Sequence, residues 1–231
     1  MRILLTMFLL SAALPCLAAD ATEQNKTAAA QTDISTSAVA AGLASWDKKL
    51  DTLEFSFSQL ITFGDSGITS KISGAVKFNK EGKLRIDHFS PQPQEVYTDK
   101  KTIWIYKPRQ AQAVRARWDD WVKQQSGSLS GITDFGAYGP LLASHKMTVS
   151  ASKDGKTVEA ALTPVKNPKS YELKLVLSRE DFFPERVFLT LGSTSVDTKI
   201  SDVRKNGKIP PEAFEFKPPK GTDVLELDGK H

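Results

Sequence analysis

The chain has 231 residues, of which 31 are basic and 27 acidic, and its formal net charge at pH 7 is +4. This length accommodates one large domain, and the positive excess is too small and too evenly spread to indicate a nucleic-acid-binding surface. A single cysteine, Cys16, excludes a disulfide framework within the chain.

The first residues, MRILLTMFLLSAALPCLAAD, are typical of a secretory signal peptide, because an arginine precedes an apolar run that ends in small residues. We expect cleavage after Ala18 or Ala19, which removes residues 1–19 and leaves a chain without cysteine. An uncleaved membrane anchor is the alternative, and Pro15 disfavours lipid attachment at Cys16. An exported protein without disulfides indicates the periplasm.

Residues 20–33 are polar and alanine-rich and predict a flexible leader, so a single domain is expected over residues 34–231. That domain begins with an amphipathic helix. Its apolar residues recur at spacings of three and four on one face, namely at Val39, Leu43, Trp46, Leu50 and Leu53. The polar residues between them lie on the other face, so the helix is expected to pack on a core.

Most of the remaining chain alternates between apolar and polar residues, as strands with one apolar face do. The clearest stretch is 72–106, where Gly82 and the proline pair at 91 and 93 mark the turns. Similar runs continue to about residue 203, for a total of about ten or eleven strands. Both parities of residues 103–106 are apolar, so their face is not assigned from the sequence.

The segment 121–144, WVKQQSGSLSGITDFGAYGPLLAS, interrupts this alternation with four glycines and a proline. Short helical turns suit it better than strand does. The sequence leaves two interpretations open, a movable cover over the sheet and a static connection packed on the core. For the first interpretation, the candidate lid residues are Ile132, Phe135, Tyr138, Leu141 and Leu142.

Catalytic groups are not evident in the sequence. The three histidines have no partner at metal-ligand spacing, and no nucleophile elbow or phosphate-binding glycine loop is present. The adjacent carboxylates at 119–120 and at 180–181 lie in turn-like positions, where solvated acids are common. We therefore expect no enzyme activity, no metal and no cofactor. An apolar sheet face with few helices to cover it predicts instead a cavity for an apolar ligand such as acyl chains.

Several segments together resemble the LolA family, periplasmic carriers of outer-membrane lipoproteins. They are LEFSFSQ at 53–59, GKLRIDHFSP at 82–91, VYTDKKTIWIYKP at 96–108, IPPEAFEF at 209–216 and PKGTDV at 219–224. The resemblance implies a mainly β fold, an unclosed antiparallel β-barrel whose apolar concave face is covered by helices and shelters the acyl chains of a lipoprotein.

The resemblance also implies a route for the cargo. Such a carrier takes the lipoprotein from an ATP-driven release complex in the inner membrane and delivers it to a receptor at the outer membrane. We expect a monomer, since the carrier presents its opening to two partners in turn. The alternatives are a half-barrel that binds free lipid or glycolipid, and a regulatory protein that senses lipoprotein.

The ligand-binding residues expected on the apolar face come from the alternating strands. They are Phe57, Ile61, Val76, Phe78, Leu84, Ile86, Val96 and Trp104.

In the family a basic residue, usually arginine, bonds to the lid and holds the empty form closed, and the corresponding position here is Lys80. Parity also places Lys80 on the apolar face. Lysine lacks the forked donors of arginine, so a lysine latch would hold less firmly. The alternative is a turn residue whose amine extends to solvent.

Overall fold

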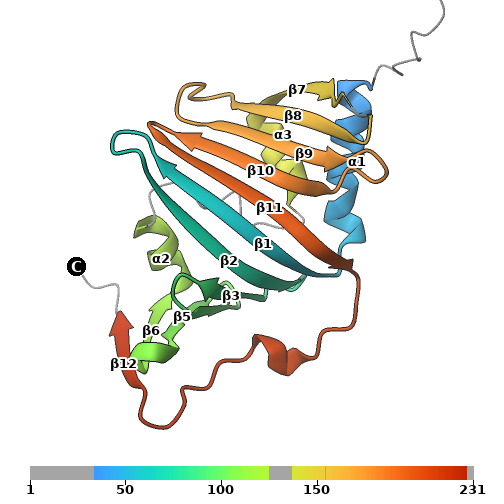
Figure 1. Cartoon of the computed structure of the whole chain (residues 1–231). Helices are drawn as coiled ribbons and strands as arrows, with labels where there is room; N and C mark the ends of the chain where they lie inside the picture. Colours follow the sequence, from blue (N-terminus) through green and yellow to red (C-terminus); the bar gives the residue numbers. More distant parts are fainter. Residues whose placement is uncertain (1–33, 125–136, 154, 228–231) are drawn as a thin grey trace, which may run out of the picture. The chain divides into compact units, whose positions relative to one another are not determined.

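The computed structural model describes residues 34–124, 137–153 and 155–227, all within a compact unit that spans Asp33–His231 (Figure 1). The predicted signal peptide and leader, and the lid residues Ile132 and Phe135, lie outside the described residues. Among the described helices, none combines the length and the hydropathy that crossing a membrane requires.

The described residues form a twelve-stranded sheet with three α-helices and two short 3-10 helices. The helices are α1 (Thr36–Lys49), α2 (Trp118–Gln124), α3 (Tyr138–Ser144), η1 (Pro108–Gln110) and η2 (Pro211–Phe214). The strands are β1 (Thr52–Phe63), β2 (Ile68–Asn79), β3 (Leu84–Ser90), β4 (Gln94–Thr98), β5 (Thr102–Lys107), β6 (Gln112–Arg117), β7 (His145–Ala151), β8 (Thr157–Pro164), β9 (Glu172–Ser178), β10 (Pro184–Leu191), β11 (Thr194–Lys205) and β12 (Asp223–Leu227).

The sheet is open. Its strand order is β12-β6-β5-β4-β3-β2-β1-β11-β10-β9-β8-β7, and the two end strands β12 and β7 are not paired with each other. Every neighbouring pair is antiparallel except β12 with β6. This confirms the predicted mainly β fold with an unclosed antiparallel sheet. The sequence missed β12, because its partner β6 lies more than a hundred residues earlier and the proline-rich tail before it carries no alternating pattern.

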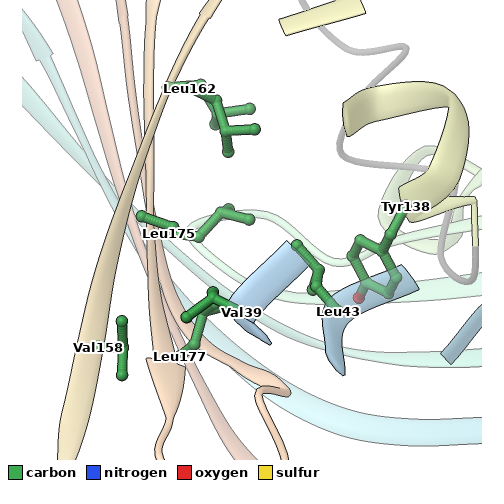
Figure 2. Packing of buried hydrophobic residues seen from close by; sticks show 9 residues of the cluster. Val39, Leu43, Tyr138, Val158, Leu162, Leu175 and Leu177 are labelled. Atoms are coloured by element: carbon green, nitrogen blue, oxygen red, sulfur yellow. The ribbon is translucent and has the colours of Figure 1, made fainter. Parts of the chain in front are cut away.

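Helix α1 confirms the predicted amphipathic helix but ends at Lys49, so Leu50 follows its end and Leu53, which was expected on the helix, lies in β1. The Ser35 hydroxyl accepts a hydrogen bond from the Ala38 amide at 3.1 Å, which caps the N-terminus, and the chain becomes extended at Leu50. Val39 and Leu43 on its apolar face are completely buried. They pack against the strands β8 and β9 in a cluster that also contains Leu162, Leu175, Leu177 and Tyr138 (Figure 2).

The C-terminal half of α1 contacts the turn between β9 and β10, and that turn is paired with the end of β11. The ring of Trp46 meets that of Phe183 edge to face at 5.3 Å, and its indole N–H donates to the Asp181 carbonyl at 2.9 Å. The carboxylate of Asp181 forms an ion pair with Lys205 at the end of β11. An aromatic contact, a hydrogen bond and burial therefore fix α1 against the sheet.

A connection that we call the strap, residues 206–222, leads from β11 to β12 and includes η2. Its Phe216 ring lies among three aromatic rings of β4 and β5, with centroid distances of 5.2 Å to Tyr97, 5.3 Å to Trp104 and 5.2 Å to Tyr106. Aromatic contacts at these distances are favourable. They hold the strap against the sheet and so bring β12 beside β6.

We predict that Phe216→Ala lowers the free energy of unfolding by about 1–3 kcal/mol, because a half-buried ring and its aromatic contacts are lost. Urea unfolding measures the loss, and amide exchange of β12 should accelerate with it. The neighbouring exposed residue gives the control, since Lys217→Ala should leave both nearly unchanged. Equal behaviour of the two variants would show that the ring does not hold the strap.

Candidate functional site

One face of the sheet is apolar across most of its width, and strand register defines it. A lateral row of paired residues crosses six strands on this face, Phe55, Val76, Ile86, Val96, Ile105 and Val114. A second row contains Leu53, Phe78, Leu84, Thr98, Ile103 and Ala116. We call the face that carries these rows the apolar face, and its opposite the outer face.

The predicted ligand-binding residues divide by burial. Val76, Phe78 and Leu84 are buried in a cluster with Leu50 of the α1 terminus and with Phe183. Other residues of the same face keep partial exposure, namely Phe57, Ile61, Ile86 and Val96. The first group forms the floor under α1, and the second group is the part of the face that remains accessible.

Trp104 does not belong to this set. It pairs with Tyr97 and Arg115, both on the outer face, and its ring contacts Phe216 of the strap. The prediction that Trp104 shares the face of Val96 is therefore corrected. The residues of β5 that point to the apolar face are Ile103 and Ile105, which are buried with Trp118 and Trp121 packed against their cluster.

The apolar face continues to the tips of two hairpins. Phe63 is the last residue of β1, Ile68 the first of β2 and Leu191 the last of β10, and they are 42%, 62% and 41% exposed. The two tips are joined, since the Gly64 amide donates to the Ser193 carbonyl at 2.8 Å and the Ser193 hydroxyl donates to Asp65 at 2.8 Å. The sequence analysis did not select these residues, although the alternation of β1 reaches Phe63.

The described part of the predicted lid is α3. Tyr138 is buried, and Leu141 and Leu142 are partly buried against the same cluster as Val39 and Leu43 of α1. Figure 2 shows the Tyr138 ring directed toward Leu43. Helix α3 therefore covers the apolar face beside α1.

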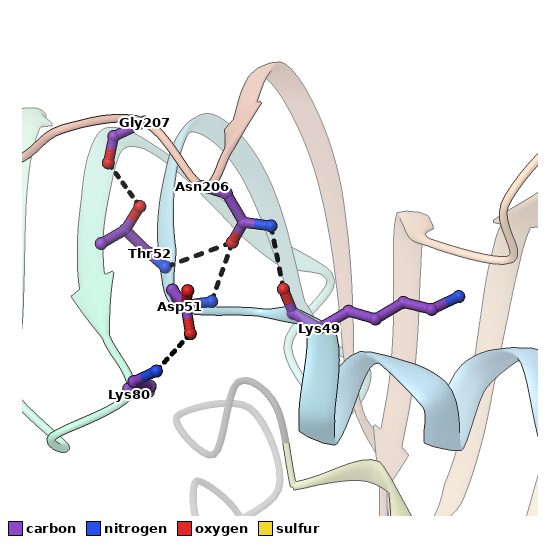
Figure 3. Close-up of polar contacts among 6 residues, drawn as sticks. All are labelled: Lys49, Asp51, Thr52, Lys80, Asn206 and Gly207. Atoms are coloured by element: carbon purple, nitrogen blue, oxygen red, sulfur yellow. Dashed lines mark hydrogen bonds and ion pairs between the residues drawn. The ribbon is translucent and has the colours of Figure 1, made fainter.

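Lys80 lies in the turn that follows β2. Its side chain is 67% exposed, and its Nζ forms an ion pair with the Asp51 carboxylate at 2.5 Å. Asn206 belongs to the same junction, because its side chain accepts from the Asp51 amide and donates to the Lys49 carbonyl (Figure 3). Parity does not apply to Lys80, since β2 ends at Asn79. Its described contacts are with the α1–β1 junction, and residues 125–136 of the predicted lid lie outside the described residues.

His88 lies on the apolar face beside its accessible part. Its ring meets that of Phe57 edge to face at 5.8 Å, and its register partner is Gly74. Burial lowers the pKa of His88 below its ordinary value of 6.5, although the charge of Asp87 opposes the shift. The imidazole is therefore held neutral, which suits an apolar surface.

A hollow of about 400 Å³ also opens on the outer face beneath the strap. Its lining combines aromatic rings with carboxylates, from Tyr97, Tyr106, Phe216, Glu95, Glu212 and Glu215, together with Lys217 and Pro219. Such a lining does not suit acyl chains, so the apolar face is the stronger candidate site. Within residues 34–124, 137–153 and 155–227, no group of three metal-ligating side chains is close enough to hold an ion.

Comparison with known proteins gives a consistent result. A family model described as outer membrane lipoprotein carrier protein LolA matches residues 48–217. The chain is 30% identical over 181 residues to the outer-membrane lipoprotein carrier protein of Chromobacterium violaceum (strain ATCC 12472). The aligned region covers 77% of this chain and 82% of that relative. The chain is 27% identical over 180 residues to the carrier of the same name from Legionella pneumophila (strain Corby), with 77% and 84% covered.

Among solved structures, an uncharacterized conserved protein from Thermus thermophilus has a similar fold. The TM-score is 0.54 at 10% identity, and the match covers 82% of this chain and 97% of that protein. At this identity the likeness concerns the fold alone.

We predict that stability falls as pH decreases from about 7.5 to about 5.5 and that His88→Gln weakens this dependence. The unfolded chain binds a proton at His88 at higher pH than the folded chain does, because burial lowers the folded pKa. The stabilising contribution is thus present above the ordinary pKa and is lost as pH falls through the folded pKa. Urea unfolding at several pH values measures the slope.

Among the described residues, three carboxyl groups have lowered pKa values, those of Asp99, Asp181 and Asp197. Their pKa values lie below the ordinary value of 3.8 and therefore outside this pH window. An equal slope for the wild type and for His88→Gln would contradict the assignment.

Proposed function

The chain belongs to the LolA family of outer membrane lipoprotein carriers, and we propose that it carries lipoproteins through the periplasm with their acyl chains on its apolar face. The observation that carries the proposal is the accessible part of that face, Phe57, Ile61, Ile86 and Val96, next to the exposed Phe63 and Ile68. An exposed apolar surface of this kind is typical of an interaction or ligand-binding site. The predicted signal peptide supports export to the periplasm.

The proposed mechanism is a competition between apolar surfaces. Burial of acyl chains contributes about 0.8 kcal/mol per methylene, so a fully enclosing cavity would hold several chains almost irreversibly. Part of the apolar face here is already occupied by α1 and α3, which a ligand must displace or pack beside. This cost weakens binding and leaves the cargo available to a receptor at the outer membrane.

We further propose that an ATP-driven complex in the inner membrane loads the carrier. The exposed residues Phe63, Ile68 and Leu191 extend the apolar face to the edge of the domain. An acyl chain that leaves the membrane complex would contact this edge first. In this scheme the carrier supplies binding energy, and the loading complex supplies the work of extracting the lipoprotein from its membrane.

We predict that the mature wild-type protein brings radiolabelled lipoprotein from spheroplasts or inner-membrane vesicles into the soluble fraction. Ile61→Glu should lower the captured amount at least about ten-fold, because a carboxylate among acyl chains loses its hydration. Leu60→Glu is the matched control, since Leu60 is the adjacent residue of β1 on the outer face and should tolerate the charge.

Two outcomes would count against the proposal. The first is a wild-type protein that releases no lipoprotein where an established carrier does. The second is native mass spectrometry of protein purified from its own periplasm that finds free lipid or glycolipid in place of lipoprotein, which would support the alternative half-barrel lipid-binding function.

The latch at Lys80 remains a prediction from the family resemblance. If Lys80 restrains the lid, Lys80→Leu should increase the access of an apolar fluorescent dye more than its stability loss explains, since an exposed ion pair contributes only about 0–1 kcal/mol. Lys83→Leu is the control, because Lys83 pairs with Glu81 in the same turn at 3.2 Å. Unchanged dye access in Lys80→Leu would leave Lys80 as a turn residue paired with Asp51.

A further inference from the structure

A single carboxylate joins the two helices that cover the apolar face. Oδ1 of Asp47 on α1 accepts a hydrogen bond from the Tyr138 amide at 2.6 Å, and Oδ2 accepts one from the Gly139 amide at 2.7 Å. Both donors lie in the first turn of α3. Asp47 is one of the polar residues between the apolar positions of the predicted helix, and local pattern gives no sign of partners 91 and 92 residues away.

The N-terminus of α3 requires such an acceptor. The first amides of a helix have no carbonyl partner within the helix, and a side chain at the N-cap commonly supplies one. Here the N-cap residue is Ala137, whose side chain makes no capping hydrogen bond. Asp47 provides the cap from another helix, and its negative charge strengthens both hydrogen bonds.

The two ends of α3 are held by different means. Its C-terminus continues directly into β7, and His145 at that boundary is within 2.8 Å of the Leu141 carbonyl and within 2.7 Å of the Tyr171 hydroxyl. Its N-terminus is held by Asp47 and by the buried ring of Tyr138. Loss of the Asp47 contact therefore leaves the N-terminal end held by the Tyr138 ring alone, while the C-terminal end keeps its attachment to the sheet.

We propose that Asp47 is a positioning residue that clasps α3 over the apolar face, so that opening of this clasp admits the apolar ligand. The inference rests on the proposed carrier function and names the contact that regulates access to the same face. An apolar helix cover with only packing contacts would slide among similar positions. Two directional hydrogen bonds to one carboxylate give α3 a single closed position.

Gly139 completes the clasp. A Cβ atom at this position would lie 2.9 Å from Oδ2 of Asp47, closer than such atoms approach in folded proteins. Gly139→Ala therefore disturbs the clasp from the α3 side while it raises the helix propensity of α3 itself. Faster opening in this variant would therefore come from the disturbed Asp47 contact and not from a less stable helix.

The experiment uses the mature chain with Asp47→Asn and Gly139→Ala, and it measures the uptake rate of an apolar fluorescent dye and the amide exchange of α3. Asn keeps the shape of Asp but turns one acceptor into a donor that faces an amide. We expect both variants to take up dye and to exchange the α3 amides roughly ten-fold faster, with a thermal midpoint near that of the wild type.

Asp197→Asn is the matched control, because the Asp197 carboxylate also accepts two hydrogen bonds, here from Arg186, and lies on the outer face opposite Leu60, away from α3. It should leave dye uptake and α3 exchange at the wild-type values. Unchanged uptake in Asp47→Asn and Gly139→Ala, or equal acceleration in all three variants, would overturn the clasp. A variant that unfolds is recognised because its amide exchange accelerates in β8 and β9 as well as in α3. In that case the other clasp variant tests the proposal.

The same variants distinguish failure of the clasp from failure of the carrier function. If the wild type captures lipoprotein and Asp47→Asn behaves like the wild type in dye uptake, the clasp is wrong and the carrier function stands. If Asp47→Asn accelerates dye uptake while the wild type captures no lipoprotein, the clasp stands and the cargo is a different apolar molecule.

Discussion

The fold depends on one constraint, the burial of an apolar face on a sheet that does not close. In a closed barrel the strands would bury this face against itself, and in a sandwich a second sheet would cover it. Here β7 and β12 stay apart, and the cover comes from short helices that connect or precede the strands. The area that these helices leave accessible is the surface on which the proposed carrier function depends, since an incompletely covered apolar face can take up an apolar ligand.

The two covering helices are attached in physically different ways, which assigns them different roles. Helix α1 is held by completely buried aliphatic residues and by the aromatic and ionic contacts around Trp46, so that its removal would expose a large part of the core. Helix α3 is only seven residues long, and a partly solvated carboxylate holds its N-terminus. Polar contacts of this kind exchange with water at little net cost, whereas buried aliphatic contacts do not. Helix α1 is thus the firmly attached part of the cover, and α3 is the part that the proposed clasp holds in place.

Local pattern was enough to predict most of the fold. The spacing of Val39, Leu43 and Trp46 gave the first helix, and alternation gave the strands and their apolar face, because these features depend on neighbours two to four residues away. The same reasoning placed Val76, Phe78 and Ile86 on one face. It failed where both parities of a strand are apolar: Trp104 lies on the outer face because the strap supplies Phe216 as its partner, and local alternation contains no information about that partner. The parallel strand β12 was missed for the same reason.

Polar contacts between distant segments were also beyond prediction, and they matter most for the site. Lys80 was selected because its sequence position matched a basic residue of the family, but its described partner is Asp51, on a turn that adjoins it only after β1 and β2 have paired. Asp47 was passed over because an acid on the polar face of an amphipathic helix is ordinarily solvated. Whether such a carboxylate meets water or two free amides depends on where a later helix begins. Here α3 begins beside α1 with an alanine at its cap, and so the carboxylate that looked dispensable becomes the acceptor that the helix lacks.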